Sequence, residues 1–343
     1  MRNAIQVLCF GFATLLSPAF LSGTANAQSP EQFYQGKTID LEIGYSAGGG
    51  YDLYARLLAR HIGRHIPGHP GVAPKNMVGS GSLSLANWLY AAAPSDGTVL
   101  GAMSRGSAFD PLLGKIGAAF DATKFNWIGS MNDEVAVCVA LPSAGITKFE
   151  DLFTHELAVG ATGVGDDSYQ FPAMLNSLMG TKFKIINGFG GGEKITMALD
   201  RGDVQGRCGW SWSSLRTTRP DWVRDKKIVL LVQMSLSKHP DLPNVPFILD
   251  LAQTPEQRQI LTLVFARNVM GRPFAVSPEV PADRVAALRE AFAETMKDKD
   301  FLADAAQGKF EINPVGGERL QALVEEAYRT PPAIATKAAS VMR

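Results

Sequence analysis

One stretch near the start of the chain decides the fold: residues 38–52, which read Thr38-Ile39-Asp40-Leu41-Glu42-Ile43-Gly44-Tyr45-Ser46-Ala47-Gly48-Gly49-Gly50-Tyr51-Asp52. Its first part alternates in polarity and is rich in β-forming residues, which is typical of a strand. Glycines then break the strand, and apolar residues recur every three or four positions from Leu53 to Ile66, as they do in a helix. The stretch therefore predicts a strand, a tight turn and a helix.

The turn from Ala47 to Gly50 has the composition of an anion-binding site. Glycine lacks a Cβ, so its backbone amides can approach a ligand at the positive end of the following helix. A carboxylate suits such a site, but similar turns also occur with no ligand. No Gly-Lys-Ser/Thr follows, so the turn is not a phosphate-binding loop, and Asp52 is expected to cap the helix.

Strands and helices continue to alternate along the chain. Beyond the first strand, further strands are expected at 99–103, 127–129, 135–141, 157–161, 183–186, 204–208, 228–234 and 273–276, with helices at 83–92, 150–153, 169–179, 193–200, 255–265, 282–296 and 318–327. The strands at 127–129 and 135–141 are expected to form a pair. This order predicts an α/β fold with two mostly parallel sheets.

Two sheets imply two lobes with a cleft between them. Residues 28–136 and 232–343 are expected to build lobe one and residues 137–231 lobe two, linked by the strands at 135–141 and 228–234. Ligands of open α/β sheets lie beyond the carboxyl ends of the strands. The loops after Tyr45, Met103, Ala161 and Cys208 are therefore the expected site.

Residues 1–27 predict a cleavable export signal. Arg2 precedes an apolar segment, and Ala25-Asn26-Ala27 has the pattern of a cleavage site, which would make Gln28 the first residue of a periplasmic protein. A retained membrane anchor is the alternative, because the apolar segment approaches spanning length. Export would place Cys138 and Cys208 where a disulfide is permitted. The two thiols can equally be buried and unbridged, because a bridge needs neighbouring strands.

Charge and motif content argue against several classes of protein. Lys plus Arg and Asp plus Glu number 33 each, so no basic field attracts nucleic acid. No Gly-x-Ser-x-Gly motif occurs, and His61 and His65 lack the glutamate of a His-Glu-x-x-His motif. We therefore expect no catalytic residues, no metal and no cofactor.

A second glycine turn, Thr162 to Ser168, also stands between a strand and a helix and is expected to face the first across the cleft. Of its two acidic residues, Asp166 and Asp167, one is expected to cap the helix and the other to be solvated. Alternatively, one of them receives a ligand amine or hydroxyl. A calcium loop lacks further acids at the required spacing.

Other residues at the expected cleft complete the candidate site. Arg105 could clamp a carboxylate or simply lie on the surface, and Trp210 could wall the cleft or anchor the core. The candidate ligand-binding residues are Ala47, Gly48, Gly49, Gly50, Asp52, Gly81, Ser82, Ser104, Arg105, Thr162, Gly163, Val164, Gly165, Asp166, Ser168 and Trp210.

Six segments in register carry a family resemblance: residues 44–52 with Ala55-Arg56, Asn76 with Gly79-Ser80-Gly81, Ala93-Pro94-Ser95-Asp96-Gly97-Thr98, Thr162-Gly163-Val164-Gly165, Gly202-Asp203-Val204, and Pro240-Asp241-Leu242-Pro243-Asn244-Val245-Pro246. From Phe33 onward the chain resembles the extracytoplasmic solute receptors of tripartite tricarboxylate transporters, the Bug or TctC-like family. Asp166-Asp167 departs from the serine, threonine or proline of many relatives. Tyr34-Gln35-Gly36-Lys37 departs from the usual Tyr-Pro-x-Lys/Arg.

The resemblance implies a type II periplasmic-binding-protein fold that closes like a flytrap. It implies that the turns at 47–52 and 162–165 hold one carboxylate through backbone amides and water, and that a monomer delivers a small organic acid to a two-component membrane permease. A periplasmic hydrolase or isomerase and a ligand-sensing partner of a signalling system are the alternatives. Ligand identity stays open.

Overall fold

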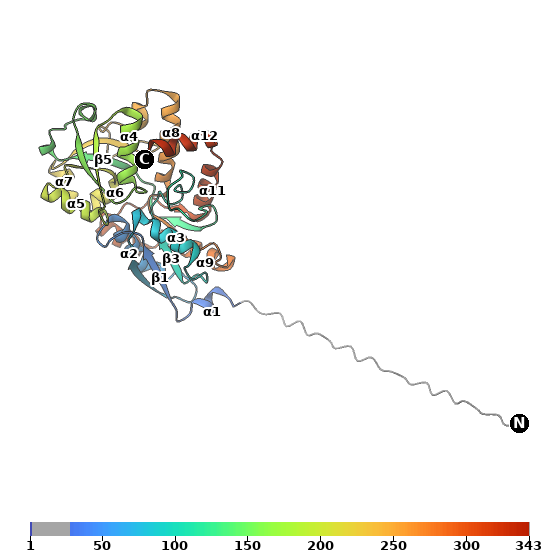
Figure 1. Ribbon diagram of the computed structural model, residues 1–343. Coiled ribbons are helices and arrows are strands. Elements are labelled where there is room, and N and C mark those ends of the chain that lie inside the picture. Colours follow the sequence, from blue (N-terminus) through green and yellow to red (C-terminus); the bar gives the residue numbers. More distant parts are fainter. Residues whose placement is uncertain (2–27, 343) are drawn as a thin grey trace.

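The chain folds into two β-sheets with helices around them, and Figure 1 shows the two sheets in separate parts of the molecule. This computed structural model describes residue 1 and residues 28–342. The predicted export signal falls on residues 2–27, outside the described part. No helix among the described residues is long and apolar enough to cross a membrane.

Sheet one has the strand order β11-β4-β10-β3-β1-β2. Its strands are β1 (Thr38–Ile43), β2 (Gly71–Asn76), β3 (Val99–Ala102), β4 (Asn126–Ser130), β10 (Pro273–Val276) and β11 (Val315–Gly316). Strand β1 pairs in parallel with β2 and β3, whereas β10 runs antiparallel to both β3 and β4. Strand β11 is also antiparallel to β4. The sheet is thus mixed, with two reversed strands, and not mostly parallel as expected.

Sheet two repeats this plan with the order β7-β6-β8-β5-β9. Its strands are β5 (Ala136–Ala140), β6 (Leu157–Ala161), β7 (Phe183–Asn187), β8 (Gly206–Ser211) and β9 (Val229–Met234). Strand β6 is parallel to β7 and β8, and β5 is antiparallel to β8 and β9. The reversed strands are therefore β5, where the chain enters sheet two, and β10 and β11, after it has returned to sheet one.

The chain passes from one sheet to the other at different residues than expected. The expected pair of strands at 127–129 and 135–141 does not form, because β4 belongs to sheet one and β5 to sheet two. Strand β9 also lies wholly in sheet two, whereas the expected boundary at 231/232 would cut it. Apolar runs alone carry no information on which sheet a strand joins. The crossings are residues 131–135 and the segment that follows Met234.

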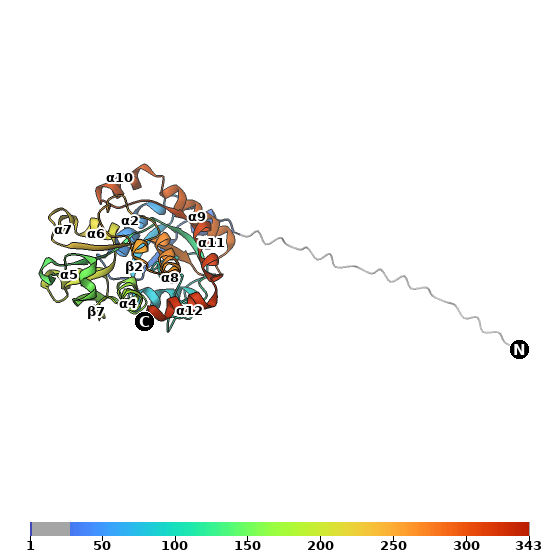
Figure 2. The ribbon, with the colours of Figure 1, turned by 90° about the horizontal axis from the view of Figure 1, so that it is seen from above.

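Helices cover both sheets (Figures 1 and 2). Lobe one is sheet one with α1 (Pro30–Tyr34), α2 (Gly50–Ile62), α3 (Leu83–Ala91), α9 (Ala282–Thr295), α10 (Lys299–Gln307) and α11 (Gly317–Tyr328), and lobe two is sheet two with α4 (Asp167–Met179), α5 (Gly192–Arg201), α6 (Trp212–Thr218) and α7 (Pro220–Arg224). Helices α8 (Pro255–Phe265) and α12 (Pro332–Val341) pack together, and α12 also contacts α4. The C-terminal helix thus touches lobe two as well.

The apolar core follows from this layering. One cluster runs through both lobes and includes Leu89 of α3, Cys138 of β5 and Phe265 of α8. Separate clusters lie behind each sheet, with Leu57 of α2 behind sheet one and Trp222 of α7 behind sheet two. Burial of this apolar surface is the main favourable contribution to folding. A core that crosses between the lobes ties them together away from the cleft.

Strand β2 is one of the elements that the sequence pattern missed. It is an edge strand of mostly half-exposed or exposed residues, and it carries Pro74. Proline cannot donate a backbone hydrogen bond, so it is tolerated in sheets mainly at edges. Without a buried face the strand shows no alternating apolar pattern. Only pairing with β1 reveals it.

Strands β5 and β8 are neighbours, and a disulfide joins their buried residues Cys138 and Cys208. The bond closes a loop with a sequence separation of 70 residues. A crosslink over such a loop restricts the unfolded chain and so favours folding.

We expect the C138A/C208A double variant to lose about 2–4 kcal/mol of unfolding free energy, since the constraint on the unfolded chain disappears. Urea unfolding monitored by circular dichroism measures the loss. The control is wild-type protein unfolded with a reductant, which should lose a similar amount. Two alkylatable thiols in unreduced periplasmic protein, detected by mass spectrometry, would contradict the bridge.

Behind the cleft, a histidine ties the segment after β9 to lobe one. His239 Nε2 lies 3.3 Å from Glu311 Oε1. Its hydrogen bond to Glu311 raises the pKa of His239 above the ordinary value of 6.5, and Asp241 acts in the same direction. The folded protein therefore holds this proton more tightly than the unfolded chain does.

The stabilisation by His239 should be complete below pH 6.5 and should be lost as the pH rises through the raised pKa of the folded state. Thermal melts between pH 5.5 and 8.5 test this, with H239Q as the comparison. The difference in melting temperature between wild type and H239Q should shrink as the pH rises. A difference that is constant over this range would refute the linkage.

Candidate functional site

The candidate site is a small cavity in the cleft between the two lobes. Its lining residues come from the turns after β1, β3 and β6, from the starts of α2, α4, α5 and α6, and from β8: Tyr45, Gly49, Gly50, Tyr51, Arg105, Thr162, Asp166, Asp167, Ser168, Gly192, Arg207, Gly209, Trp210, Ser211 and Ser214. The cavity volume is only about 40 Å³. The lobes are therefore closed on each other.

The glycine turn after β1 faces the start of α5. A Cβ placed on Gly49 would lie 3.8 Å from the backbone nitrogen of Glu193 and 3.9 Å from that of Gly192. Gly191 in turn packs directly on Ser46. A side chain at Gly191 would separate the two turns, whereas a Cβ on Gly49 would make only ordinary contacts. Glycine at position 191 thus permits the close approach of the lobes.

The turn at 162–168 does not lie directly opposite the triple glycine, as the sequence had suggested. Gly163 instead packs against the backbone of Ser80 and Gly81, and Gly81 also meets Asp166. The cleft thus has two pairs of facing turns. Sequence order cannot reveal which turns meet, because the relative rotation of the lobes decides it.

Helices α2 and α5 both begin at the cleft. Gly49 and Gly191 are their N-caps, and neither helix has a side chain that caps its first turn from the N-cap position. The first amides of a helix have no acceptor within the helix. Together with the helix dipoles, these amides favour an anion between the two helix starts.

Asp52 stabilises the glycine turn but does not cap the helix as expected. It lies in the first turn of α2, is buried, and accepts hydrogen bonds from the backbone N–H of Gly48 and from Arg56 and Asn76. All of these partners belong to lobe one. Asp52 therefore shapes the turn and does not line the cavity.

The two acidic residues of the second turn have different partners. Asp166 caps α4 by accepting from the backbone N–H of Ser168, and across the cleft it accepts from the Tyr45 hydroxyl at 2.5 Å. Although burial acts in the opposite direction, the hydrogen bonds from Ser168 and Tyr45 leave the pKa of Asp166 below its ordinary value. Asp166 is thus an ionised carboxylate at the closed cleft.

Asp167 is not solvated, contrary to expectation. It is buried and forms an ion pair with Arg105 of lobe one and another, at 3.2 Å, with Arg267. Arg105 also donates to Ser211. Buried charges are tolerated when they are paired and hydrogen-bonded. Arg105 therefore already holds a carboxylate, that of the protein itself.

Arg207 of β8 is the cation at the cleft without such a partner. Its Nη1 donates to the carbonyl of Gly192 at 3.0 Å and to Thr196 at 3.1 Å, and its guanidinium lies 4.3 Å from the centre of the Trp210 ring. Its Nε is buried and has no hydrogen-bond partner among the described residues. Burial lowers the pKa of Arg207 to about 9, against the opposing effects of Asp166 and Glu193.

Ser46 supplies a second unsatisfied group beside the facing turns. Its hydroxyl is buried against Gly191 and has no partner in the described part of the chain. Burying a polar group without a hydrogen bond is costly. Ser46 and Arg207 contact the adjacent glycines Gly191 and Gly192. Both groups, and the helix starts next to them, fit an acceptor-rich anion.

Sequence reasoning found part of this site. Of the candidate residues, the cavity is lined by Gly49, Gly50, Arg105, Thr162, Asp166, Ser168 and Trp210. Outside its lining lie Ala47, Gly48, Asp52, Gly81, Ser82, Ser104, Gly163, Val164 and Gly165. The lining residues that the candidate list lacked are Tyr45, Tyr51, Asp167, Gly192, Arg207, Gly209, Ser211 and Ser214. The glycines before α5 were the available signal for Gly192, since they repeat the pattern before α2.

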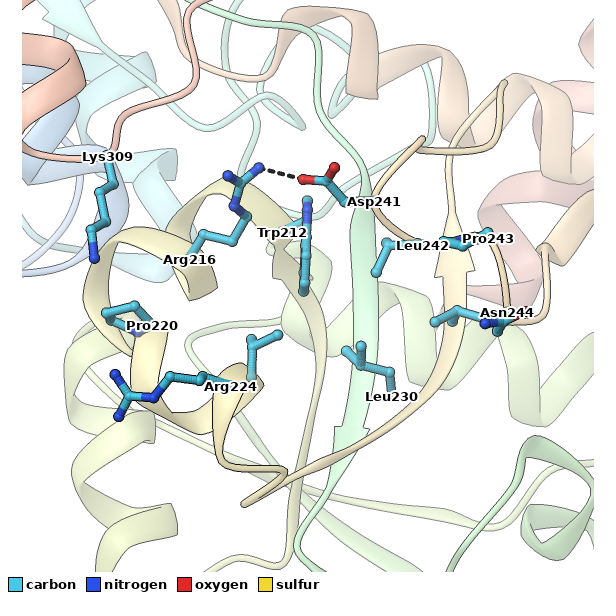
Figure 3. Close-up of a pocket in the computed structure, with 12 residues that line it drawn as sticks. Trp212, Arg216, Pro220, Arg224, Leu230, Asp241, Leu242, Pro243, Asn244 and Lys309 are labelled. Carbon is cyan, nitrogen blue, oxygen red and sulfur yellow. Dashed lines mark hydrogen bonds and ion pairs between the residues drawn. The ribbon is translucent and has the colours of Figure 1, made fainter.

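A larger, open pocket of about 500 Å³ lies between α6, α7 and the loop before Pro246 (Figure 3). Arg216 at its edge is already paired with Asp241 at 2.6 Å. None of its lining residues belongs to the turns after β1, β3 or β6. Among the described residues, no group of three or more potential ligands is placed to hold a metal ion. The cleft is thus the better candidate.

The two lobes and the cleft between them have the fold of two-lobed periplasmic binding proteins, and comparison with solved structures agrees. The periplasmic binding protein BugD matches with a TM-score of 0.71 and 20% identity over 90% of this chain and 99% of its own. MatC from Rhodopseudomonas palustris with bound malate matches with a TM-score of 0.69 and 18% identity over 88% and 99%. An R. palustris protein with adipate matches with a TM-score of 0.68 and 17% identity over 89% and 98%.

These likenesses confirm the fold that the family resemblance implied: the chain shares the architecture of Bug and TctC periplasmic binding proteins. No protein-family model and no curated protein sequence matches the chain.

Replacing Gly191 by alanine should disfavour closure, because the new Cβ would collide with Ser46. Overpacking of this kind costs about 1–3 kcal/mol. Small-angle X-ray scattering should show a larger radius of gyration for Gly191→Ala than for wild type. Gly190→Ala is the matched control, since a Cβ there meets nothing within 4 Å. Equal radii for both variants would argue against the packing role.

Proposed function

We propose that this chain is an exported solute-binding receptor that captures a small carboxylate-bearing organic solute between its lobes and delivers it to a membrane permease. The observation that carries the proposal is the meeting of two helix starts with an unpaired guanidinium, that of Arg207, at one closed cleft. Such a site supplies positive potential and hydrogen-bond donors together.

The named ligands of two structural neighbours support an organic acid. MatC was solved with malate and another R. palustris protein with adipate, and both share this fold. We carry over to this chain only the class of ligand. The periplasm is the expected location, in keeping with the neighbours described as periplasmic binding proteins.

Closure of the lobes would be the working step of the receptor. The contacts Tyr45–Asp166 and Arg105–Asp167 both join lobe one to lobe two. These contacts form only when the lobes approach, so they favour the closed form. A ligand that touches both lobes adds to this preference and shifts the population further towards closure.

The cleft chemistry favours binding over catalysis. The cavity is lined by Ser211 and Ser214, and each of these hydroxyls accepts a hydrogen bond from Arg272, which cannot act as a general base. A serine nucleophile needs a neighbouring base that takes its proton. The third lining serine, Ser168, donates to Asp166, but the lowered pKa of Asp166 makes this carboxylate a weak base. The lining contains neither histidine nor cysteine. A hydrolase or isomerase is therefore the less favoured alternative.

Thermal-shift screening of organic acids tests the proposal. A bound acid should raise the melting temperature. At a concentration one hundred times its Kd, it adds about 2.7 kcal/mol to the free energy of unfolding. Each acid is compared with its uncharged primary amide, which should give a much smaller shift because it lacks the negative charge. NMR should recover the acid unchanged after incubation. Conversion of the acid would support an enzyme, and no shift with any acid would refute the receptor.

A further inference from the structure

We infer that the receptor selects short monocarboxylates with an uncharged, hydrogen-bonding remainder over dicarboxylates, and that Arg207 is the residue that receives the ligand carboxylate. This inference rests on the proposed function and makes it more specific. Three observations carry it: the balance of buried charges, the occupied state of Arg105, and the size of the cavity.

The charges that line or support the cleft do not balance. Its cations are the buried Arg105, Arg267 and Arg272 and the partly buried Arg207, and its carboxylates are Glu134, Asp166 and Asp167. The other charged residues nearby pair among themselves: Arg219 with Glu193 and with the exposed Asp200, Asp52 with Arg56, and Asp110 with Lys115. Among the four arginines and three carboxylates of the cleft, one positive charge is left over. A ligand with a single negative charge would neutralise it.

Arg207 is the arginine of the cleft that has no paired carboxylate in the described part of the chain. Arg105 and Arg267 share Asp167, and Arg272 lies 3.2 Å from Glu134. Arg207 forms no ion pair within 4.0 Å among the described residues, and its Nε has no hydrogen-bond partner there. An uncompensated cation in a closed cleft is destabilising. A ligand carboxylate at Arg207 would remove this cost. The closed form would therefore be more stable with a ligand bound than without one.

The position of Arg207 suits a carboxylate. Its Nη1 is anchored to the carbonyl of Gly192, so the guanidinium is held at the start of α5. Gly49, at the start of α2, lies close to the backbone nitrogens of Gly192 and Glu193. A carboxylate between these groups would face a cation and two helix starts at once. Charge-assisted hydrogen bonds of this kind are about twice as strong as neutral ones.

A second ligand carboxylate would find no free cation. Asp167 already occupies Arg105 and Arg267, the other two arginines that meet at this turn. Asp167 thus takes the place that a second ligand carboxylate would need, and we call it a built-in carboxylate. Asp166, ionised and hydrogen-bonded to Tyr45, faces the same cavity and would repel a second negative charge. A dicarboxylate would therefore bury an unpaired charge.

The size and polarity of the cavity limit the rest of the ligand. The rings of Tyr45 and Tyr51 stack with centroids 4.4 Å apart, and both line a cavity of about 40 Å³. The hydroxyls of Ser168, Ser211 and Ser214 also line it. A remainder of a few atoms that offers a hydroxyl or keto group matches these walls. A long aliphatic chain does not.

The first experiment compares ligands on the wild-type protein. Isothermal titration calorimetry at one pH and salt concentration should give glycolate or lactate a Kd about tenfold or more below those of malate and succinate, because one charge-assisted contact is at stake. Equal or tighter binding of malate and succinate would overturn the inference and leave the proposed function standing. Failure of every acid to bind would overturn the proposed function, and this inference with it.

The second experiment removes the anchor. In R207Q, binding of glycolate or lactate should weaken about 10- to 100-fold. Because Arg207 also donates to Gly192 and Thr196, circular dichroism checks that the variant is folded. A purely structural role would lower the melting temperature and leave the affinity of the folded variant unchanged. R201Q, an exposed arginine of α5 paired with Asp203, is the matched control and should bind as wild type does. Unchanged binding by R207Q would overturn the role of Arg207.

The third experiment makes Arg105 and Arg267 available to a second ligand carboxylate. D167N should free Arg105 and Arg267, so that malate and succinate bind at least tenfold more tightly than they bind to wild type. Circular dichroism checks that the variant is folded. If D167N does not fold, the ligand comparison and R207Q still decide the question. A folded D167N with unchanged weak binding of dicarboxylates would overturn the role of Asp167 as a built-in carboxylate.

Discussion

The buried ion pair between Arg105 and Asp167 is the interaction on which the closed cleft depends. Arg105 follows β3 of lobe one, and Asp167 begins α4 of lobe two, so the pair exists only when the lobes meet. Neither charge could stay buried alone without a large cost. The pair therefore sets how closely the lobes approach, and the Tyr45–Asp166 hydrogen bond beside it depends on the same approach.

Close approach also requires a backbone without side chains at the contact. Gly191 and Gly163 each stand where a Cβ would collide with atoms of the opposite lobe. The glycines thus do two things at once, since they let the lobes touch and leave helix amides open to a ligand. This double use explains why a glycine-rich turn precedes both α2 and α5.

Charge placement separates this cleft from a simple anion site. A cleft built only from helix starts would accept any anion of suitable size. Here Asp166 and Asp167 bring negative charge to the same place, and Arg207 is left as the one arginine of the cleft without a carboxylate within 4.0 Å in the described part of the chain. The protein's own carboxylates thereby narrow the ligands that the cleft tolerates. Selectivity for the ligand therefore depends on Arg105 being already paired with Asp167 as much as on Arg207 being unpaired.

By itself, the sequence determined the strand–turn–helix units, the α/β class with two sheets, and the glycine turn at one end of the site. These features are local, because periodicity, glycine and capping act over a few residues. Only the tertiary structure decided that β4 and β5 part to different sheets, that residues 46–50 face the start of α5, and that Asp167 pairs with Arg105 while Arg207 stays unpaired. These features depend on contacts between residues tens to hundreds of positions apart. The identity of a charged residue does not indicate whether its partner is water, another residue or a ligand.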